Sequence, residues 1–176
     1  MYMKTRCMVW LLLAIGCMFI IYHTSGTSYS QQDIKPAMEK YISRTAAQLP
    51  SIHFSYDHEN VSTEQPSVFT HFILRKAGHV TEYAILTFFM MMSIRFSNYP
   101  FVLRICASCT AAFLFAWVDE WHRLIVPDRL GSFLDVYTFD LVGIVLCAVF
   151  YSMLHVVVQK RDTSLPVQNE EEPEGI

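Results

Sequence analysis

Four long apolar runs constrain this chain more than any other feature of its sequence. They are Met8–Tyr22, Ala77–Ile94, Phe101–Val118 and Phe133–Val158, and only a few polar residues interrupt them. A helix needs about 20 residues to cross the roughly 30 Å hydrocarbon layer of a bilayer, a length that the first run reaches with its flanking residues. Backbone groups in lipid must be satisfied internally, so each run is expected to be a helix. The sequence predicts an all-α integral membrane protein with four transmembrane helices.

The composition supports a membrane protein and excludes one class of partner. Of the 176 residues, 53% are hydrophobic and 16% are charged, whereas soluble domains carry about 25% charged residues. The net charge of −3 gives no basic face of the kind that nucleic-acid binding needs. The lipid bilayer is therefore the expected partner, and nucleic acid is not.

The first run could be read as a secretory signal peptide, because Lys4 and Arg6 precede a short apolar core. The residues that follow, 23–28, form a poor cleavage site, and we expect residues 1–22 to remain as an anchor. Basic residues elsewhere give no orientation bias, so the first helix decides the orientation. The N-terminus, and with four spans the C-terminus, are predicted to be cytoplasmic.

The segments between and after the runs divide the rest of the chain. Residues 23–74 are predicted to form an extracytoplasmic loop, in which apolar residues at helical spacing indicate an amphipathic helix over 33–49. Alternating polarity over Ser51–Asp57 predicts a short strand, so a small helix/strand insertion separates the first two spans. Residues 75–158 would form a three-helix membrane core, and residues 159–176 an acidic cytoplasmic tail.

Ionisable residues inside the last three spans point to a functional site. Each one costs about 2.5–3.5 kcal/mol on insertion scales, and the four-span topology gathers them at the outer ends of three helices. Arg75, His79 and Glu82 share one helical face because they are four and three residues apart. The candidate binding residues are Arg75, Lys76, His79, Glu82, Tyr83, Asp119, Glu120, His122, Arg129, Ser132, Asp135 and Asp140.

Several of these residues also have simpler structural interpretations. Ser132 followed by Asp135 has the spacing of a helix-capping pair, and Lys76 could extend to lipid headgroups. His122, Arg123 and Arg129 are expected in the loop after the third span. A structural ion-pair network is the alternative for the whole set.

The sequence favours neither a metal nor a cofactor. His79, Glu82, Glu120, His122 and Asp140 have ligating atoms, but no H-E-x-x-H motif is present. G-x-S-x-G, P-loop and dinucleotide motifs are also missing from the sequence. We expect no cofactor and no bound metal.

Three motifs, taken in order, resemble those of the VanZ-like membrane protein family. Arg75–Leu86 (RKAGHVTEYAIL) resembles its R-K-x-x-H-x-x-E-Y-x-x-L segment. Asp119–Arg123 with Pro127–Arg129 resembles D-E-x-x-Q…P-x-R, except that Arg123 stands where a Gln is usual. Ser132–Asp135 and Asp140–Gly143 resemble S-x-x-D…D-x-x-G. The resemblance covers roughly residues 72–145.

The resemblance implies a four-helix membrane protein of the bacterial cell envelope. The outer stretch Ser28–Tyr41 is also similar to the corresponding stretch of Gram-positive members. The family's namesake is an accessory factor in glycopeptide resistance that gives low-level teicoplanin resistance. The resemblance implies a cellular context and no particular reaction.

The favoured hypothesis is a non-enzymatic protein whose outer pocket binds an anionic envelope component or an amphiphilic glycopeptide drug. Arg75, Lys76, Arg123 and Arg129 would hold a phosphate or carboxylate in this pocket.

Two alternatives give the same residues other roles. In a membrane enzyme acting on a lipid-linked or cell-wall substrate, His79 and Glu82 would be acid/base candidates, with Asp119 or Asp140 orienting them. In a small transporter component, Glu82 and Asp140 would relay protons.

Overall fold

The computed structural model describes residues 2–26, 50–57, 59–127 and 131–164. The amphipathic helix predicted over 33–49, Arg129 and the end of the acidic tail lie outside these residues. The described elements, in chain order, are α1 (Tyr2–Ser25), β1 (His53–Tyr56), β2 (Glu59–Ser62), α4 (Pro66–Ser93), α5 (Phe101–Ile125), α6 (Phe133–Asp135), the π-helical turn η1 (Val136–Asp140) and α7 (Leu141–Ser164).

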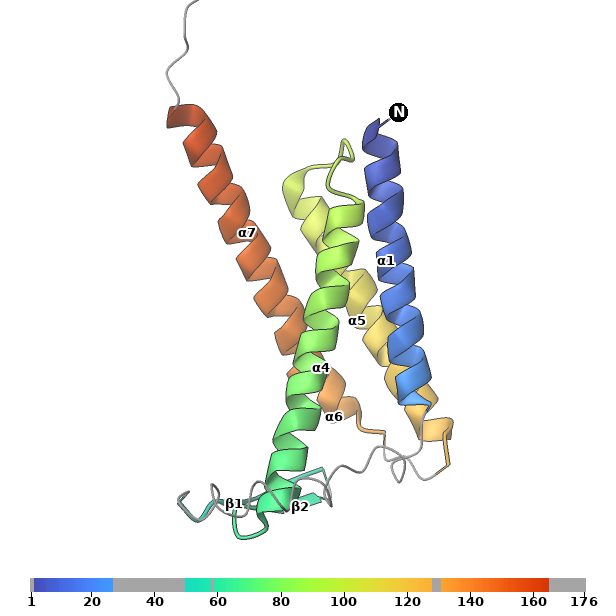
Figure 1. Cartoon of the computed structure of the whole chain (residues 1–176), viewed down its shortest axis with the longest axis vertical. Helices are drawn as coiled ribbons and strands as arrows, with labels where there is room; N and C mark the ends of the chain where they lie inside the picture. Colours follow the sequence, from blue (N-terminus) through green and yellow to red (C-terminus); the bar gives the residue numbers. More distant parts are fainter. Residues whose placement is uncertain (1, 27–49, 58, 128–130, 165–176) are drawn as a thin grey trace, which may run out of the picture.

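The long helices run alternately in opposite directions and form a bundle with two distinct ends (Figure 1). The hairpin end contains β1, β2, the start of α4 and the end of α5. The opposite end, here called the terminal end, contains the start of α1 and the end of α7. Helices α1, α4 and α5 pack together, whereas α7 contacts α4 near the hairpin end and diverges from it toward the terminal end (Figure 1).

Three helical segments in the described part of the chain are long and apolar enough to cross a membrane: Thr5–Ser25, Phe101–Ile125 and Phe133–Arg161. These segments confirm three of the four predicted spans at the level of helix length and composition. Helix α4 is not among them, although it has 28 residues, because Arg75, Lys76 and Glu82 make its sequence less apolar. The fourth span stays a prediction.

The core of the bundle lies where α4 meets α1, α5 and the π-helical turn. Tyr83 and Leu86 of α4 are fully buried, as are Ala112 and Ala116 of α5. Small residues let helices approach closely in a membrane bundle, so the two alanines allow α5 to pack directly against α4. Large apolar side chains on the outer faces of α1 and α7 remain exposed, as expected for surfaces that contact lipid.

A single glycine permits the close crossing of α4 and α7. A Cβ atom added to Gly143 would overlap the carbonyl oxygen of Val80 on α4. Val80 follows His79, and Gly143 lies three residues after Asp140. The crossing therefore holds these two polar residues next to each other.

The two strands form an antiparallel hairpin that packs on the start of α4. The strand predicted over Ser51–Asp57 is confirmed as β1, and its last residue, Tyr56, pairs with Glu59 of β2. The ring centroids of Phe54 and Tyr56 lie 5.6 and 5.5 Å from that of Phe72 on α4. This packing brings Tyr56 and Glu59 to the polar residues of α4.

Candidate functional site

The buried face of α4 carries three polar side chains near the hairpin end. Lys76, His79 and Tyr83 recur three and four residues apart, so they project from the same side of the helix. Lys76 retains only 3% of its surface accessibility and His79 only 6%. Polar groups buried to this extent need partners, and the other helices provide them.

Arg123 is the centre of the buried network. Its Nη2 lies 2.9 Å from Oδ2 of Asp119, and its Nη1 lies 3.5 Å from Oε2 of Glu120. Its Nε and Nη2 also donate hydrogen bonds to the hydroxyl of Ser25 at the end of α1, at 3.1 and 2.9 Å. The Ser25 hydroxyl in turn donates to Asp119 at 2.9 Å. One guanidinium therefore ties α1 to α5.

His122 and Arg123 both lie in α5, so the prediction that they lie in the loop after the third span is wrong. Helix α5 continues to Ile125, because the ion pair of Arg123 with Asp119 stabilises its last turn at i,i+4 spacing. His122 faces away from the network, and its ring stacks on Tyr22 of α1 with centroids 4.0 Å apart.

His79 connects Arg123 to the π-helical turn. Nη1 of Arg123 lies 2.8 Å from Nε2 of His79, and Nδ1 of His79 lies 2.8 Å from Oδ1 of Asp140. A guanidinium only donates hydrogen bonds, so Nε2 must accept one and the imidazole is neutral. The remaining ring proton is then on Nδ1 and is donated to Asp140. Both nitrogens of His79 are engaged.

The π-helical turn explains how Asp135 and Asp140 both reach the α4 face. A π-helical turn contains one more residue than an α-helical turn, so residues five apart come close to the same side. Such turns occur frequently at functional sites. Asp140 is 1% exposed and Asp135 is 6% exposed, and each contacts a different side chain of α4.

Asp135 forms a second buried group with Lys76 and Tyr56. Nζ of Lys76 lies 2.5 Å from Oδ1 of Asp135, and the Tyr56 hydroxyl donates to the same oxygen at 2.8 Å. The ammonium also lies 4.4 Å from the ring centroid of Tyr56, within cation–π range. Burial raises the pKa of Tyr56 above its ordinary value, which keeps the hydroxyl protonated as a donor.

Two simpler interpretations of these residues are wrong. Lys76 does not extend to lipid headgroups, because its ammonium is enclosed by Asp135 and aromatic rings. Ser132 occupies the position before α6, but its side chain forms no capping hydrogen bond. Its backbone N–H donates to Glu120 instead. Asp135 therefore holds α4 and the hairpin in place rather than capping a helix.

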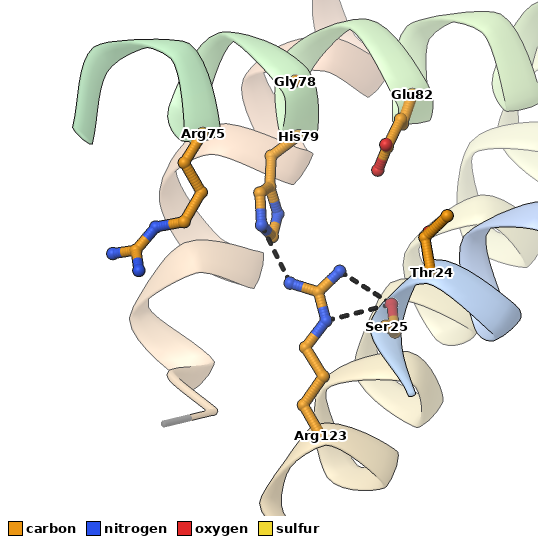
Figure 2. Close-up of a pocket in the computed structure, with 7 residues that line it drawn as sticks. All are labelled: Thr24, Ser25, Arg75, Gly78, His79, Glu82 and Arg123. Atoms are coloured by element: carbon orange, nitrogen blue, oxygen red, sulfur yellow. Dashed lines mark hydrogen bonds between the residues drawn. The ribbon is translucent and has the colours of Figure 1, made fainter. Parts of the chain in front are cut away.

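A cavity of about 290 Å³ opens beside this network (Figure 2). Its lining comes from α1, α4 and α5 and consists of Thr24, Ser25, Arg75, Gly78, His79, Glu82 and Arg123. Glu82 points from α4 toward the side of the cavity formed by Thr24 and Ser25, and Arg75 lies at the opposite side (Figure 2). The cavity thus presents cationic and anionic groups at separate places.

The two arginines of the cavity differ in how they are held. Arg123 is enclosed by Asp119, Glu120 and Ser25. Arg75 is only partly buried, and its Nη2 lies 2.8 Å from Oε2 of Glu59, a residue of the hairpin. Nε of Arg75 is buried and has no hydrogen-bond partner among the described residues. Arg75 is therefore the arginine with capacity to bind a further anionic group.

The structure brings most of the predicted site residues together. Tyr83 joins the network by donating to Asp119 at 3.3 Å, and His122 is the described residue that lies apart. The structure adds to the site four residues that the sequence did not indicate, namely Thr24, Ser25, Tyr56 and Glu59. Ser25 had one available signal, its position at the outer end of the first predicted span. No group of three ligating side chains in the described ranges is arranged to hold a metal ion.

Comparisons with known proteins give one match. The family model described as VanZ/LLP1 matches residues 8–155, which include the hairpin, α4, α5 and most of α1 and α7. No curated protein and no solved structure matches the chain.

Proposed function

The chain belongs to the VanZ/LLP1 family, and from this membership and the polar cavity we propose a role in the bacterial cell envelope. The protein binds an anionic group of an envelope component, or of an amphiphilic glycopeptide, in the cavity at the hairpin end. By doing so it reduces access of the drug to its target and contributes to teicoplanin-type resistance.

The proposed topology has four spans, with α4 as the fourth. Helix α4 is about 42 Å long at 1.5 Å per residue, and its buried Lys76 and His79 contact other helical segments rather than lipid. Residues 1–22 then anchor the chain, residues 23–74 form the outer loop, residues 75–158 the membrane core and residues 159–176 a cytoplasmic tail. Both termini are cytoplasmic, so the cavity opens on the outer side.

Arg75 is the observation that carries the proposed function. It is the cavity arginine whose partner, Glu59, lies on the small hairpin rather than inside the bundle. An incoming phosphate or carboxylate with the geometry of the Glu59 carboxylate would replace that ion pair with another of the same kind. Glu59 therefore competes with the anionic ligand for Arg75.

Glu82 limits which anions fit the cavity. Its carboxylate lies on the same helix as Arg75, two turns further along, and points into the cavity (Figure 2). A ligand that carried only negative charge would be repelled there. The cavity suits a group that combines an anion for Arg75 with a hydroxyl or amine that can donate to Glu82.

Catalysis by His79 has less support. A general base needs a free nitrogen within reach of the proton it removes, but Nε2 of His79 receives Arg123 and Nδ1 contacts Asp140. A relay between Glu82 and Asp140 also has less support, because Asp140 contacts His79 whereas Glu82 faces the cavity.

Filling the cavity tests the proposed function without disturbing the buried network. A Cβ atom at Gly78 meets nothing within 4 Å, so Gly78→Leu adds its side chain to open space in the cavity. Gly78→Ala is the matched control. Each variant complements a deletion strain at equal protein level, and the teicoplanin susceptibility of the strain is measured.

We expect Gly78→Leu and Arg75→Gln to lose resistance and Gly78→Ala to keep it. Glu59→Gln removes the competing carboxylate and should keep resistance or raise it. Full resistance in both Gly78→Leu and Arg75→Gln would show that the cavity is not the site.

A further inference from the structure

A second cavity lies at the terminal end of the bundle, remote from the polar network. It has a volume of about 380 Å³ and lies between the start of α1 and the end of α4. Its lining is Thr5, Arg6, Val9, Trp10, Met92, Arg95 and Phe96. Two arginines, one from α1 and one from the loop after α4, therefore face one space that has a largely apolar wall.

The two charged residues that line this cavity are both basic. Its lining contains no Asp or Glu. The basic side chains described at the terminal end are Arg6, Arg95, Arg104, Lys160 and Arg161. The lining of the cavity is therefore positively charged.

Neighbouring groups hold the walls of the cavity in place. The ring of Trp10 packs against Phe88 and Phe89 of α4, with centroids 5.8 and 5.9 Å apart. The guanidinium carbon of Arg95 lies 5.6 Å from the ring centroid of Phe96, and the backbone carbonyl of Arg95 accepts a hydrogen bond from Arg104. The aromatic wall and the loop that carries Arg95 are thus formed before any ligand arrives.

We propose that this cavity binds the headgroup of an anionic phospholipid from the leaflet at the terminal end. The phosphate lies between Arg6 and Arg95, and the acyl chains follow Val9, Trp10 and Met92. Basic pockets between transmembrane helices are suited to anionic headgroups, and guanidinium groups pair with phosphate oxygens through several hydrogen bonds. A free anion would use the two arginines but leave the apolar wall exposed, which favours the lipid.

Quenching of tryptophan fluorescence tests this site directly, because Trp10 is part of its wall. Trp117 and Trp121 lie on α5 and are exposed, so Trp117→Phe with Trp121→Phe leaves Trp10 as the single reporter. The full-length protein is reconstituted into vesicles of phosphatidylcholine and phosphatidylglycerol. Brominated acyl chains, which quench tryptophan on contact, are placed on one lipid or the other at the same mole fraction.

We expect brominated phosphatidylglycerol to quench Trp10 more strongly than brominated phosphatidylcholine does. The apparent preference for phosphatidylglycerol over phosphatidylcholine should be at least about fivefold, because one basic residue near an anionic surface contributes about that factor to binding. The Arg6→Gln/Arg95→Gln double variant should lose this preference. The matched control, Lys160→Gln/Arg161→Gln, removes two charges from α7 at the same end of the bundle and should keep the preference. Arg95→Lys preserves the charge and should keep most of it.

Three outcomes would overturn the proposal. Equal quenching by the two brominated lipids would exclude selective binding. A preference that survives in the Arg6→Gln/Arg95→Gln variant, or one that the control variant loses equally, would assign it to general surface charge. Relief of quenching by millimolar inorganic phosphate would identify a free-anion site rather than a lipid site.

Discussion

The two ends of the bundle both carry arginines but use them differently. At the hairpin end, Arg123 is 7% exposed and contacts two carboxylates, a hydroxyl and an imidazole. At the terminal end, Arg6 and Arg95 are exposed and line a cavity without acidic residues. Burial determines the difference, because a charge removed from water must be paired inside the protein.

This contrast separates structural charges from charges available for ligands. Arg123 and Lys76 satisfy buried carboxylates of the protein itself, so they hold the helices and the hairpin together. Arg75 is intermediate, since it is partly buried and its partner Glu59 lies on the hairpin. Arg95 is exposed to solvent. The loss of stability on substitution should therefore be largest for the most buried of these residues and smallest for the most exposed.

The largest loss of stability is expected from Arg123→Met. The substitution leaves Asp119 and Glu120 buried without their cation, and breaking a buried pair from one side costs about 3–5 kcal/mol. Unfolding by denaturant in detergent micelles measures the free energy of unfolding. Arg123→Gln, which restores the residue usual in the family's motif, keeps an amide donor for these carboxylates and should cost less. A Met variant within about 1 kcal/mol of the wild type would contradict the central role of Arg123.

The spanning segments and the location of the site could be predicted from the sequence. Run lengths and composition identify α1, α5 and α7. The spacing of Arg75, His79 and Glu82 places them together on α4, and these three residues do line one cavity. Residue spacing shows which side chains share one face of a helix, and the alternating direction of successive spans shows which helix ends lie on the same side of the membrane. Both can be read from a single sequence.

The partners of individual charges could not be predicted in this way. The contact of Tyr56 with Asp135 joins residues 79 positions apart, and no local pattern specifies it. The apolar run of the third span ends at Val118, so the sequence predicts a loop position for Arg123, although an ion pair extends α5 to Ile125. The π-helical turn that aims Asp140 at His79 has no sequence signature of its own.

A smaller loss is expected from Gly143→Ala, which tests whether the network depends on the α4–α7 crossing. The added methyl group would overlap the Val80 carbonyl, so the helices must separate, and overpacking typically costs about 1–3 kcal/mol. Thermal unfolding in micelles measures the effect. Gly78→Ala is the control, because its methyl group enters open space and helix propensity favours Ala by up to about 1 kcal/mol. Equal melting temperatures for the two variants would show that the crossing is not tight.

Tyr56→Phe should lower the free energy of unfolding by about 1 kcal/mol, the net value of a typical hydrogen bond. It should also change how the free energy of unfolding responds to alkaline pH. Burial raises the pKa of Tyr56 in the folded state, so folding favours the protonated phenol. Its contribution is complete below the ordinary tyrosine pKa of about 10 and is lost as the pH rises above it. The Phe variant lacks this loss.

The difference in unfolding free energy between the wild type and Tyr56→Phe should therefore shrink between about pH 10 and pH 11.5. Taking the difference cancels the other eight of the nine tyrosines. A difference that stays constant over this range would mean that the Tyr56 phenol is not held by Asp135.

The smallest effect on stability is expected from Arg95→Gln, the counterpart of Arg123→Met at the other end of the bundle. Arg95 is exposed and its guanidinium contacts the ring of Phe96, and surface substitutions of this kind usually change stability by less than about 0.5 kcal/mol. The same micelle unfolding experiment measures both variants, so burial is the main difference between them. If Arg95→Gln destabilised the protein as much as Arg123→Met, the arginine at the terminal end would be structural too, and the contrast between the two ends would fail. If instead stability is unchanged while the preference for anionic lipid falls, the charge at this end serves binding and not folding.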